Sequence, residues 1–186
     1  MEVDVRRLTS WADALDYARE TVGKKPLHKE PSSEWKTRIL VAGHSPARTV
    51  MFAIRFTGIK SWVSVHLVRH SKFAEHFVST QRPDRTGSNV NRDELPQGAL
   101  VNHTIVTNAM EIIAISKKRL CRLAAPETRE AWEAVVKALG RIGEKELAAE
   151  CVPECEARGY VCPEMNGCGK CPPRGVRSDV RLLPAE

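Results

Sequence analysis

Residues 68–82 read VRHSKFAEHFVSTQR, a stretch in which Arg69 lies beside a histidine near the start and a second arginine, Arg82, is at the end. A further cationic segment starts with RDELP at residues 92–96 and continues to Asn108, which heads a helical pattern with Arg119 near its end. Arginine is permanently charged, and its planar fork matches phosphate oxygens and the carbonyl edges of pyrimidines. Arginines that converge from a loop and a helix would therefore form a pocket for an anion.

The bulk composition is that of a soluble globular protein, with 42% hydrophobic and 28% charged residues in a chain of 186. This length suffices for one ordinary core. No segment approaches the ~20 consecutive apolar residues that a membrane span needs. The N-terminal residues 1–4, MEVD, lack the basic and apolar run of a signal peptide. We therefore expect a cytoplasmic protein without a membrane partner, in which the six cysteines are thiols or metal ligands rather than disulfides.

The net charge of +6 favours anionic partners such as nucleotides, folates, flavins or nucleic acid. A solvated basic surface without any such partner is an equally good explanation of the charge alone. Few aromatic residues, 5% of the chain, make a base-stacking surface for nucleic acid the less favoured alternative.

Hydrophobic periodicity and capping signals predict an alternation of helices with a few strands. The segments 24–36 and 81–99 are predicted as loops, and residues 62–68 fit either a strand or a short helix. The predicted strands are residues 3–7 and 50–56, and the predicted helices are residues 10–23, 107–120, 126–140 and 144–150. We expect an α+β fold: one compact domain over residues 1–150, with a small mixed or antiparallel sheet packed against helices, and a cysteine-rich tail over residues 151–186.

The order of these motifs resembles the flavin-dependent thymidylate synthase family, in a shortened and divergent form such as phages carry. The similarity extends over residues 38–140 and implies the fold of that family. It rests on the following segments: LVAGHSP at 40–46, the strand around Phe52, Gly58-Ile59, HLVRH at 66–70, Arg92, Leu95-Pro96, Asn108-Ala109 and Arg119.

In that family a homotetramer binds FAD and deoxyuridine monophosphate (dUMP) at sites shared between subunits. NADPH reduces the flavin, and methylenetetrahydrofolate supplies the one-carbon unit. The resemblance implies that Arg119 binds and activates the pyrimidine, and that Arg92 is its partner at the nucleotide. It places Ser79 on the phosphate side, where Arg82 would substitute for an arginine that the family has one residue earlier. The implied flavin contacts are Arg69, His70 and Asn108.

The chain also departs from the signature motif of the family. Ser71 replaces an arginine, Phe77 replaces a glutamate, and Met110 and Ala114 replace an arginine and a polar residue. Each lost charge-assisted contact removes about 1.5–3 kcal/mol of binding free energy. These losses weaken the flavin side more than the nucleotide side, which is therefore the better preserved of the two. Three functions are considered: a synthase-like enzyme that makes dTMP or a modified pyrimidine, a non-catalytic deoxynucleotide-binding protein on the same scaffold, and a metal-containing nucleic-acid-binding protein.

Ordinary structural roles account for several of these residues individually. Asn108 is a good helix N-cap, and Arg119 lies where a helix dipole favours cations. His70 next to Arg69 fits a buried, hydrogen-bonded histidine. The functional interpretation therefore depends on the ordered set of segments rather than on any one residue.

The tail contains the two-residue spacing of a zinc knuckle, C-G-K-C at residues 168–171. Cys121 or Cys151 is a possible substitute ligand for such a site. An iron–sulfur cluster is less favoured because the spacing matches no standard run, and a set of reduced thiols without metal is the remaining alternative. The predicted metal ligands are Cys155, Cys162, Cys168 and Cys171.

Overall fold

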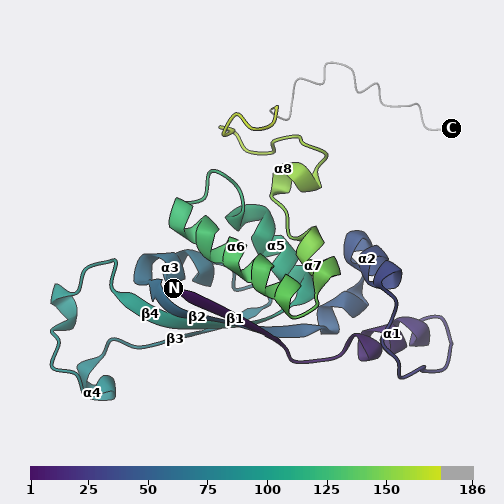
Figure 1. The fold of residues 1–186 in the computed structure, drawn as a ribbon, viewed down its shortest axis with the longest axis horizontal. Helices are drawn as coiled ribbons and strands as arrows, with labels where there is room; N and C mark the ends of the chain where they lie inside the picture. Colours follow the sequence, from purple (N-terminus) through teal and green to yellow (C-terminus); the bar gives the residue numbers. More distant parts are fainter. Residues whose placement is uncertain (173–186) are drawn as a thin grey trace.

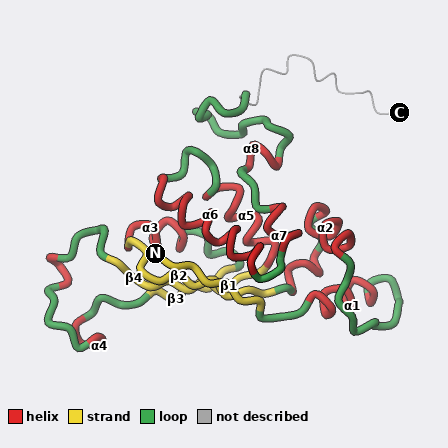
Figure 2. Tube along the Cα trace, viewed as in Figure 1, coloured by secondary structure: helices red, strands yellow, loops and turns green. Residues whose placement is uncertain are grey.

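A computed structural model describes residues 1–172 and shows an antiparallel sheet with helices packed on one of its faces (Figures 1 and 2). The four strands lie in the order β1-β2-β4-β3. Their bounds are Glu2–Arg7 for β1, Met51–Lys60 for β2, Ala74–Val78 for β3 and Leu100–Asn108 for β4. This arrangement confirms the expected α+β fold class.

The two faces of the sheet differ because side chains alternate along each strand. The cross-strand row Val5, Ile54 and Ile105 is buried under the helices. The adjacent row contains Asp4 and Arg55, which are exposed on the opposite face. The helices therefore cover one face of the sheet, and the other face is open in a single chain.

Eight α-helices and two 3₁₀ turns are found among the described residues. The α-helices are α1 (Trp11–Glu20), α2 (Ser33–Ala42), α3 (Ser61–Val68), α4 (Pro83–Thr86), α5 (Ala109–Arg119), α6 (Pro126–Arg141), α7 (Lys145–Glu150) and α8 (Glu154–Ala157). The 3₁₀ turns are η1 (Ser45–Thr49) and η2 (Arg92–Glu94). None of the described helices is both long enough and apolar enough to cross a membrane.

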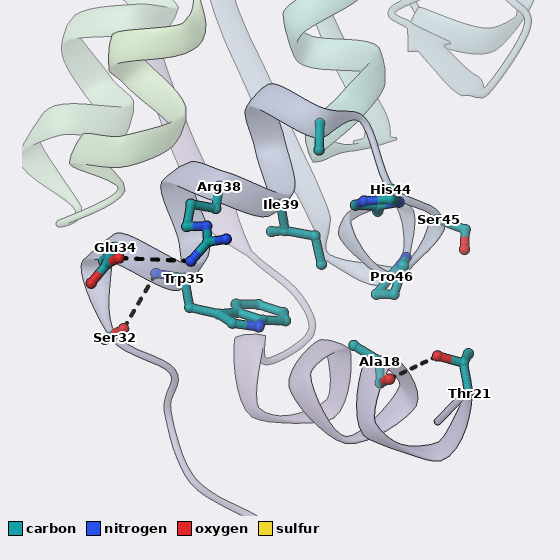
Figure 3. Close-up of a pocket in the computed structure, with 11 residues that line it drawn as sticks. Ala18, Thr21, Ser32, Glu34, Trp35, Arg38, Ile39, His44, Ser45 and Pro46 are labelled. Carbon is teal, nitrogen blue, oxygen red and sulfur yellow. Dashed lines mark hydrogen bonds and ion pairs between the residues drawn. The ribbon is translucent and has the colours of Figure 1, made fainter. Parts of the chain in front are cut away.

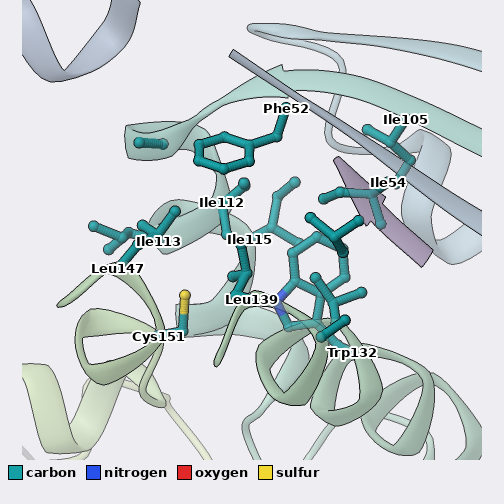
Figure 4. Packing of buried hydrophobic residues seen from close by; sticks show 14 of the residues in the cluster. Phe52, Ile54, Ile105, Ile112, Ile113, Ile115, Trp132, Leu139, Leu147 and Cys151 are labelled. Carbon is teal, nitrogen blue, oxygen red and sulfur yellow. The ribbon is translucent and has the colours of Figure 1, made fainter. Parts of the chain in front are cut away.

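The main core forms where β2 meets α5 and α6 (Figure 4). Phe52 from the sheet, Ile112 from α5 and Trp132 from α6 are fully buried there. The indole N–H of Trp132 donates to Oγ of Ser116 at 2.8 Å, and that hydroxyl donates to the carbonyl of Ile112 at 2.7 Å. The polar atoms that enter the core are thus satisfied, and α5 is fixed against both the sheet and α6.

The sequence-based prediction of a helix over residues 107–120 was wrong at its start, and the strand before it was missed. Residues 100–108 form β4, which pairs with both β2 and β3. Thr107 lies opposite Phe52 in this ladder, so pairing with β2 extends the strand to Asn108. Polar residues such as His103 interrupt the apolar alternation that would have indicated a strand, and only cross-strand pairing overrides this local signal.

Two further predictions are corrected. The predicted loop over 24–36 ends earlier, because Ser32 caps α2 by accepting a hydrogen bond from the backbone N–H of Trp35 at 3.2 Å. The strand predicted to end at residue 56 continues to Lys60 in β2, where the pairing with β4 shifts register between Phe56 and Ile59. Gly58 has φ +69°, a conformation that glycine adopts readily, and this allows the strand to continue past the irregularity.

Candidate functional site

Arg119 meets His70 where the C-terminal ends of α5 and α3 come together. Nε of Arg119 donates to Nε2 of His70 at 2.8 Å, and the Nη2 group donates to the backbone carbonyl of His66 at 2.6 Å. That carbonyl belongs to the last turn of α3, where helix carbonyls have no partner within the helix. Arg119 therefore caps α3 and holds His70 at the same time.

The contact with Arg119 determines the protonation of His70. An acceptor nitrogen carries no proton, so the ring is neutral with its hydrogen on Nδ1. Burial, and after it the charges of Arg119 and His76, lower the pKa of His70 to about 4. His70 is thus neutral near pH 7 and leaves the guanidinium charge uncompensated.

Arg69 and Arg119 form a cationic cluster that no acidic side chain of the described residues neutralises. Neither guanidinium forms an ion pair with a carboxylate within residues 1–172. The pKa of Arg119 is lowered first by burial and then by the positive charge of Arg69. The pKa of His66 is lowered by burial, then by Arg119 and Arg69. Arg119 is half-buried and Arg69 is exposed, and their uncompensated charge fits an anionic ligand.

A chain of hydrogen bonds connects this cluster with the interior of the protein. Nδ1 of His103 is 3.0 Å from Oγ of Ser64, and its Nε2 is 3.0 Å from Nδ1 of His76. Nε2 of His76 is 2.9 Å from the backbone carbonyl of His70, so that nitrogen donates and carries the proton. Burial and then His76 lower the pKa of His103 to about 4. No local pattern pointed to His103, because β4 was not predicted.

The nucleotide-side residues do not join this cluster within one chain. Arg92 is exposed in η2, on the segment between β3 and β4 that projects away from the body of the protein (Figure 1). Nε and Nη2 of Arg82 donate to the two carboxylate oxygens of Asp84 at 3.0 and 2.6 Å. Ser79 accepts a hydrogen bond from the backbone N–H of Asn102 at 2.9 Å. The described chain thus brings together only Arg119, Arg69 and His70 from the predicted set.

Asn108, the third predicted flavin contact, is buried at the start of α5. Its side-chain oxygen accepts a hydrogen bond from the backbone N–H of Glu111 at 3.0 Å. This is the capping role that the sequence also indicated. Three turns of helix separate this cap from Arg119. Because the cap fixes where α5 begins, it also sets the direction of the helix that carries Arg119.

A separate open cleft lies between α1, α2 and η1 (Figure 3). Its volume is about 710 Å³, and Trp35, Arg38 and His44 are among its lining residues. Nη1 of Arg38 is 3.8 Å from a carboxylate oxygen of Glu34, so that charge is partly compensated. The sequence did not indicate this cleft, because the N-terminal turn of α2 was expected to be loop. The GHSP segment at residues 43–46, which contributes His44 to the lining, was the signal that could have indicated the cleft.

The predicted metal ligands gather in the tail. Cys155, Cys162 and Cys171 form a buried cluster of their own, and Cys168 lines the same small cavity. All six cysteines are free thiols. No three histidine, cysteine or acidic side chains within residues 1–172 are arranged to hold a metal ion. Cys151 lies instead in the main core, where burial raises the pKa of its thiol to about 12.

The architecture defines a thymidylate synthase-like α+β fold. Two crystal structures of the flavin-dependent thymidylate synthase ThyX from Helicobacter pylori, both with FAD and dUMP, share it with a TM-score of 0.65. The alignments cover 82% of this chain and 100% and 99% of those chains, at 15% and 14% sequence identity. No protein-family model and no curated protein sequence matches this chain. The fold implied by the resemblance in sequence motifs is thereby confirmed.

Proposed function

We propose that this chain is a flavin-dependent thymidylate synthase-like enzyme that binds dUMP at the cluster of Arg119, Arg69 and His70. The observation that carries the proposal is a pair of arginines that form no ion pair with a carboxylate of residues 1–172, located on a fold that binds FAD and dUMP in the ThyX structures. A nucleotide monophosphate and a polarised pyrimidine ring both supply the negative charge that this pair lacks. In the proposed reaction a one-carbon unit is transferred from methylenetetrahydrofolate to C5 of the base.

Arg119 has the donors that this role requires. A guanidinium has five N–H groups, and the hydrogen bonds to His70 and to the carbonyl of His66 use two of them. The remaining N–H groups would donate to a carbonyl oxygen of the pyrimidine and stabilise the negative charge that makes C5 nucleophilic before it attacks the one-carbon donor. Because His70 and α3 already fix the arginine, little reorganisation accompanies binding.

FAD would bind at the same cluster. Arg69 and the Nδ1–H of His70 would donate hydrogen bonds to its phosphate and carbonyl oxygens. When bound, the flavin supplies the hydride that completes the methyl group, after its reduction by NADPH. The fit is weaker than in a complete signature motif. Phe77 and Ala114 are exposed apolar side chains where the family has a charged and a polar residue.

Arg92 would reach the cluster of a neighbouring subunit. It is exposed on a projecting segment, and the uncovered face of the sheet offers a surface for association (Figure 1). We propose a homotetramer in which each nucleotide site takes Arg119 from one chain and Arg92 from another. Closed symmetry of this kind repeats the same shared site in every subunit.

A non-catalytic deoxynucleotide-binding protein on the same scaffold is the second candidate. It is favoured by the loss of flavin-side groups at Ser71, Phe77 and Met110, while Arg119 remains available to a nucleotide. In this case dUMP binds and no product forms.

The test is calorimetric titration of the purified chain with dUMP, with and without FAD, followed by assay of dTMP in the presence of NADPH and methylenetetrahydrofolate. We expect Arg119→Ala to weaken dUMP binding on the order of 10- to 100-fold. Arg129→Ala, a control on α6 whose partner is Glu133, should leave binding unchanged. Binding of dUMP without turnover would select the second candidate, and equal affinity of wild type and Arg119→Ala would refute both.

A further inference from the structure

Five cysteines line one small cavity where the tail returns to the end of α5. The cavity has a volume of about 20 Å³, enough for about one water-sized occupant. α8 contacts α5 beside it, and Nζ of Lys118 is 3.1 Å from a carboxylate oxygen of Glu164 across the same junction. The cysteines are Cys121, Cys155, Cys162, Cys168 and Cys171.

Within the described part of the tail, the buried interior consists of thiols. The buried cluster that Cys155, Cys162 and Cys171 form contains no aliphatic or aromatic side chain. A segment of this size cannot be held in one conformation by so little apolar burial, and small units of this kind need a cross-link or a metal ion. The thiols are all free, so the fold of the tail requires another element that connects them.

The backbone around the thiols is adapted to them. A Cβ atom added to Gly167 would lie 3.2 Å from Sγ of Cys162, so the chain passes closely over that sulfur. Gly169, between Cys168 and Cys171, has φ +79°. This left-handed conformation favours glycine and lets a C-x-x-C turn direct both sulfurs toward one point.

We propose that Cys155, Cys162, Cys168 and Cys171 bind one structural zinc ion. Four thiolates are soft ligands that select zinc in tetrahedral geometry. Three of the sulfurs are already buried together, and the half-exposed Cys168 completes the set when its side chain and those of the cluster rotate toward the ion. This rotation is required because the present side-chain arrangement within residues 1–172 holds no metal.

Charged residues of both signs line the cavity. Glu154 and Glu164 are paired with Arg158 and Lys118, and Lys170 is paired with Glu156. A zinc ion with four cysteine thiolates has a net negative charge, so Arg122 and Lys170 are its favourable neighbours in this lining. Cationic neighbours stabilise thiolates. Cys121 lies two positions after Arg119, so the zinc-bound tail packs against the helix that carries this arginine. The proposal concerns metal binding alone and does not depend on the nucleotide-binding function.

The test is metal analysis of the full-length chain purified with zinc and without chelator. We expect about one zinc per chain, a value typical of a single four-cysteine site. Cys162→Ser and Cys168→Ser should each lower the zinc content well below one per chain, whereas Cys121→Ser and Cys151→Ser should retain it. Full zinc content in Cys168→Ser, or its loss in Cys121→Ser, would overturn the proposed ligand set.

A second measurement on the wild type avoids dependence on variants that fail to fold. Replacement of zinc by cobalt should produce the intense thiolate-to-cobalt charge-transfer bands of a tetrahedral four-sulfur site. Added zinc should also protect four of the six cysteines from alkylation. The absence of both effects would overturn the proposal. So would a disulfide between any of the four cysteines in the intact mass, or the visible absorption of an iron–sulfur cluster in the purified chain.

Discussion

Arg119 and His70, separated by 49 positions in the chain, share a hydrogen bond of 2.8 Å in which the guanidinium is the donor. The imidazole consequently remains neutral and orients the cation without cancelling its charge. A carboxylate in the same place would hold Arg119 equally well but would neutralise it, and an anion would then bind less tightly. The pairing of arginine with histidine thus combines a fixed geometry with a net positive site.

The energetic coupling of this pair is the first prediction. His70→Ala and Arg119→Ala should each weaken dUMP binding, and the double variant should lose less than the sum of the two losses. We expect a coupling energy of about 0.5–3 kcal/mol, the range for residues in direct contact. Calorimetric titration of the four proteins with dUMP measures it. Strict additivity would show that His70 does not act through Arg119.

The second prediction concerns pH. The pKa of His103 is lowered from 6.5 in the unfolded chain to about 4 in the fold, so the unfolded chain binds its proton first as pH falls. The contribution of His103 to stability is complete above pH 6.5 and decreases as pH falls to about 4. At ~1.4 kcal/mol per pKa unit, the loss is about 3 kcal/mol. Urea titrations of wild type and His103→Gln across this range should show a steeper decline in the wild type.

His103→Gln is a suitable comparison because glutamine retains hydrogen-bonding groups for Ser64 and His76 but does not titrate. The pKa of His70 is lowered to about 4 as well, so some decline should persist in the variant. Identical pH dependence in the two proteins would mean that His103 is not the buried neutral group described.

The third prediction tests whether Arg92 and Arg119 of one site come from different subunits. Arg92→Ala and Arg119→Ala chains, co-expressed in equal amounts, would form mixed oligomers. Random assembly of a shared site restores about a quarter of the intact nucleotide sites, as expected for a symmetric oligomer. Tight dUMP sites counted by titration provide the measurement. If both arginines belong to one chain, the mixture recovers no tight sites.

The fourth prediction concerns the core beneath α5. Ser116→Ala removes the acceptor of the Trp132 indole N–H, which is buried and would have no partner. An unsatisfied buried donor costs about 1–3 kcal/mol, and we expect this loss in the free energy of unfolding measured with urea. Ser71→Ala, at an exposed position before β3, should change stability by less than about 0.5 kcal/mol.

The extent of successful prediction differs between local and non-local features. The helix starts at Ser10 and Pro126 follow from capping and proline signals within a few residues, and α1 and α6 begin as predicted. The strand around Phe52 was recognised from its β-branched and aromatic residues. In contrast, β4 has polar residues on its buried face as well, at His103 and Thr107, and these interrupt the apolar alternation that would have marked it as a strand.

The candidate site shows the same division. The resemblance implied that Arg119 binds the pyrimidine and that Arg69 and His70 contact the flavin, and the structure brings these three side chains together. The resemblance did not indicate His103, because the relay through His76 depends on the pairing of β3 with β4. The positions of Arg82 and Arg92 also depended on tertiary structure, since one pairs with Asp84 and the other lies on a projecting segment.

The sequence by itself determined which residues start helices, which carry permanent charge, and which could bind metal, because these properties belong to side chains and their near neighbours. Only the tertiary structure decided which of them meet. Pairing between distant strands and the packing of α3 against the end of α5 depend on contacts across tens of residues, and the free energy of such contacts leaves no periodic trace in the local sequence.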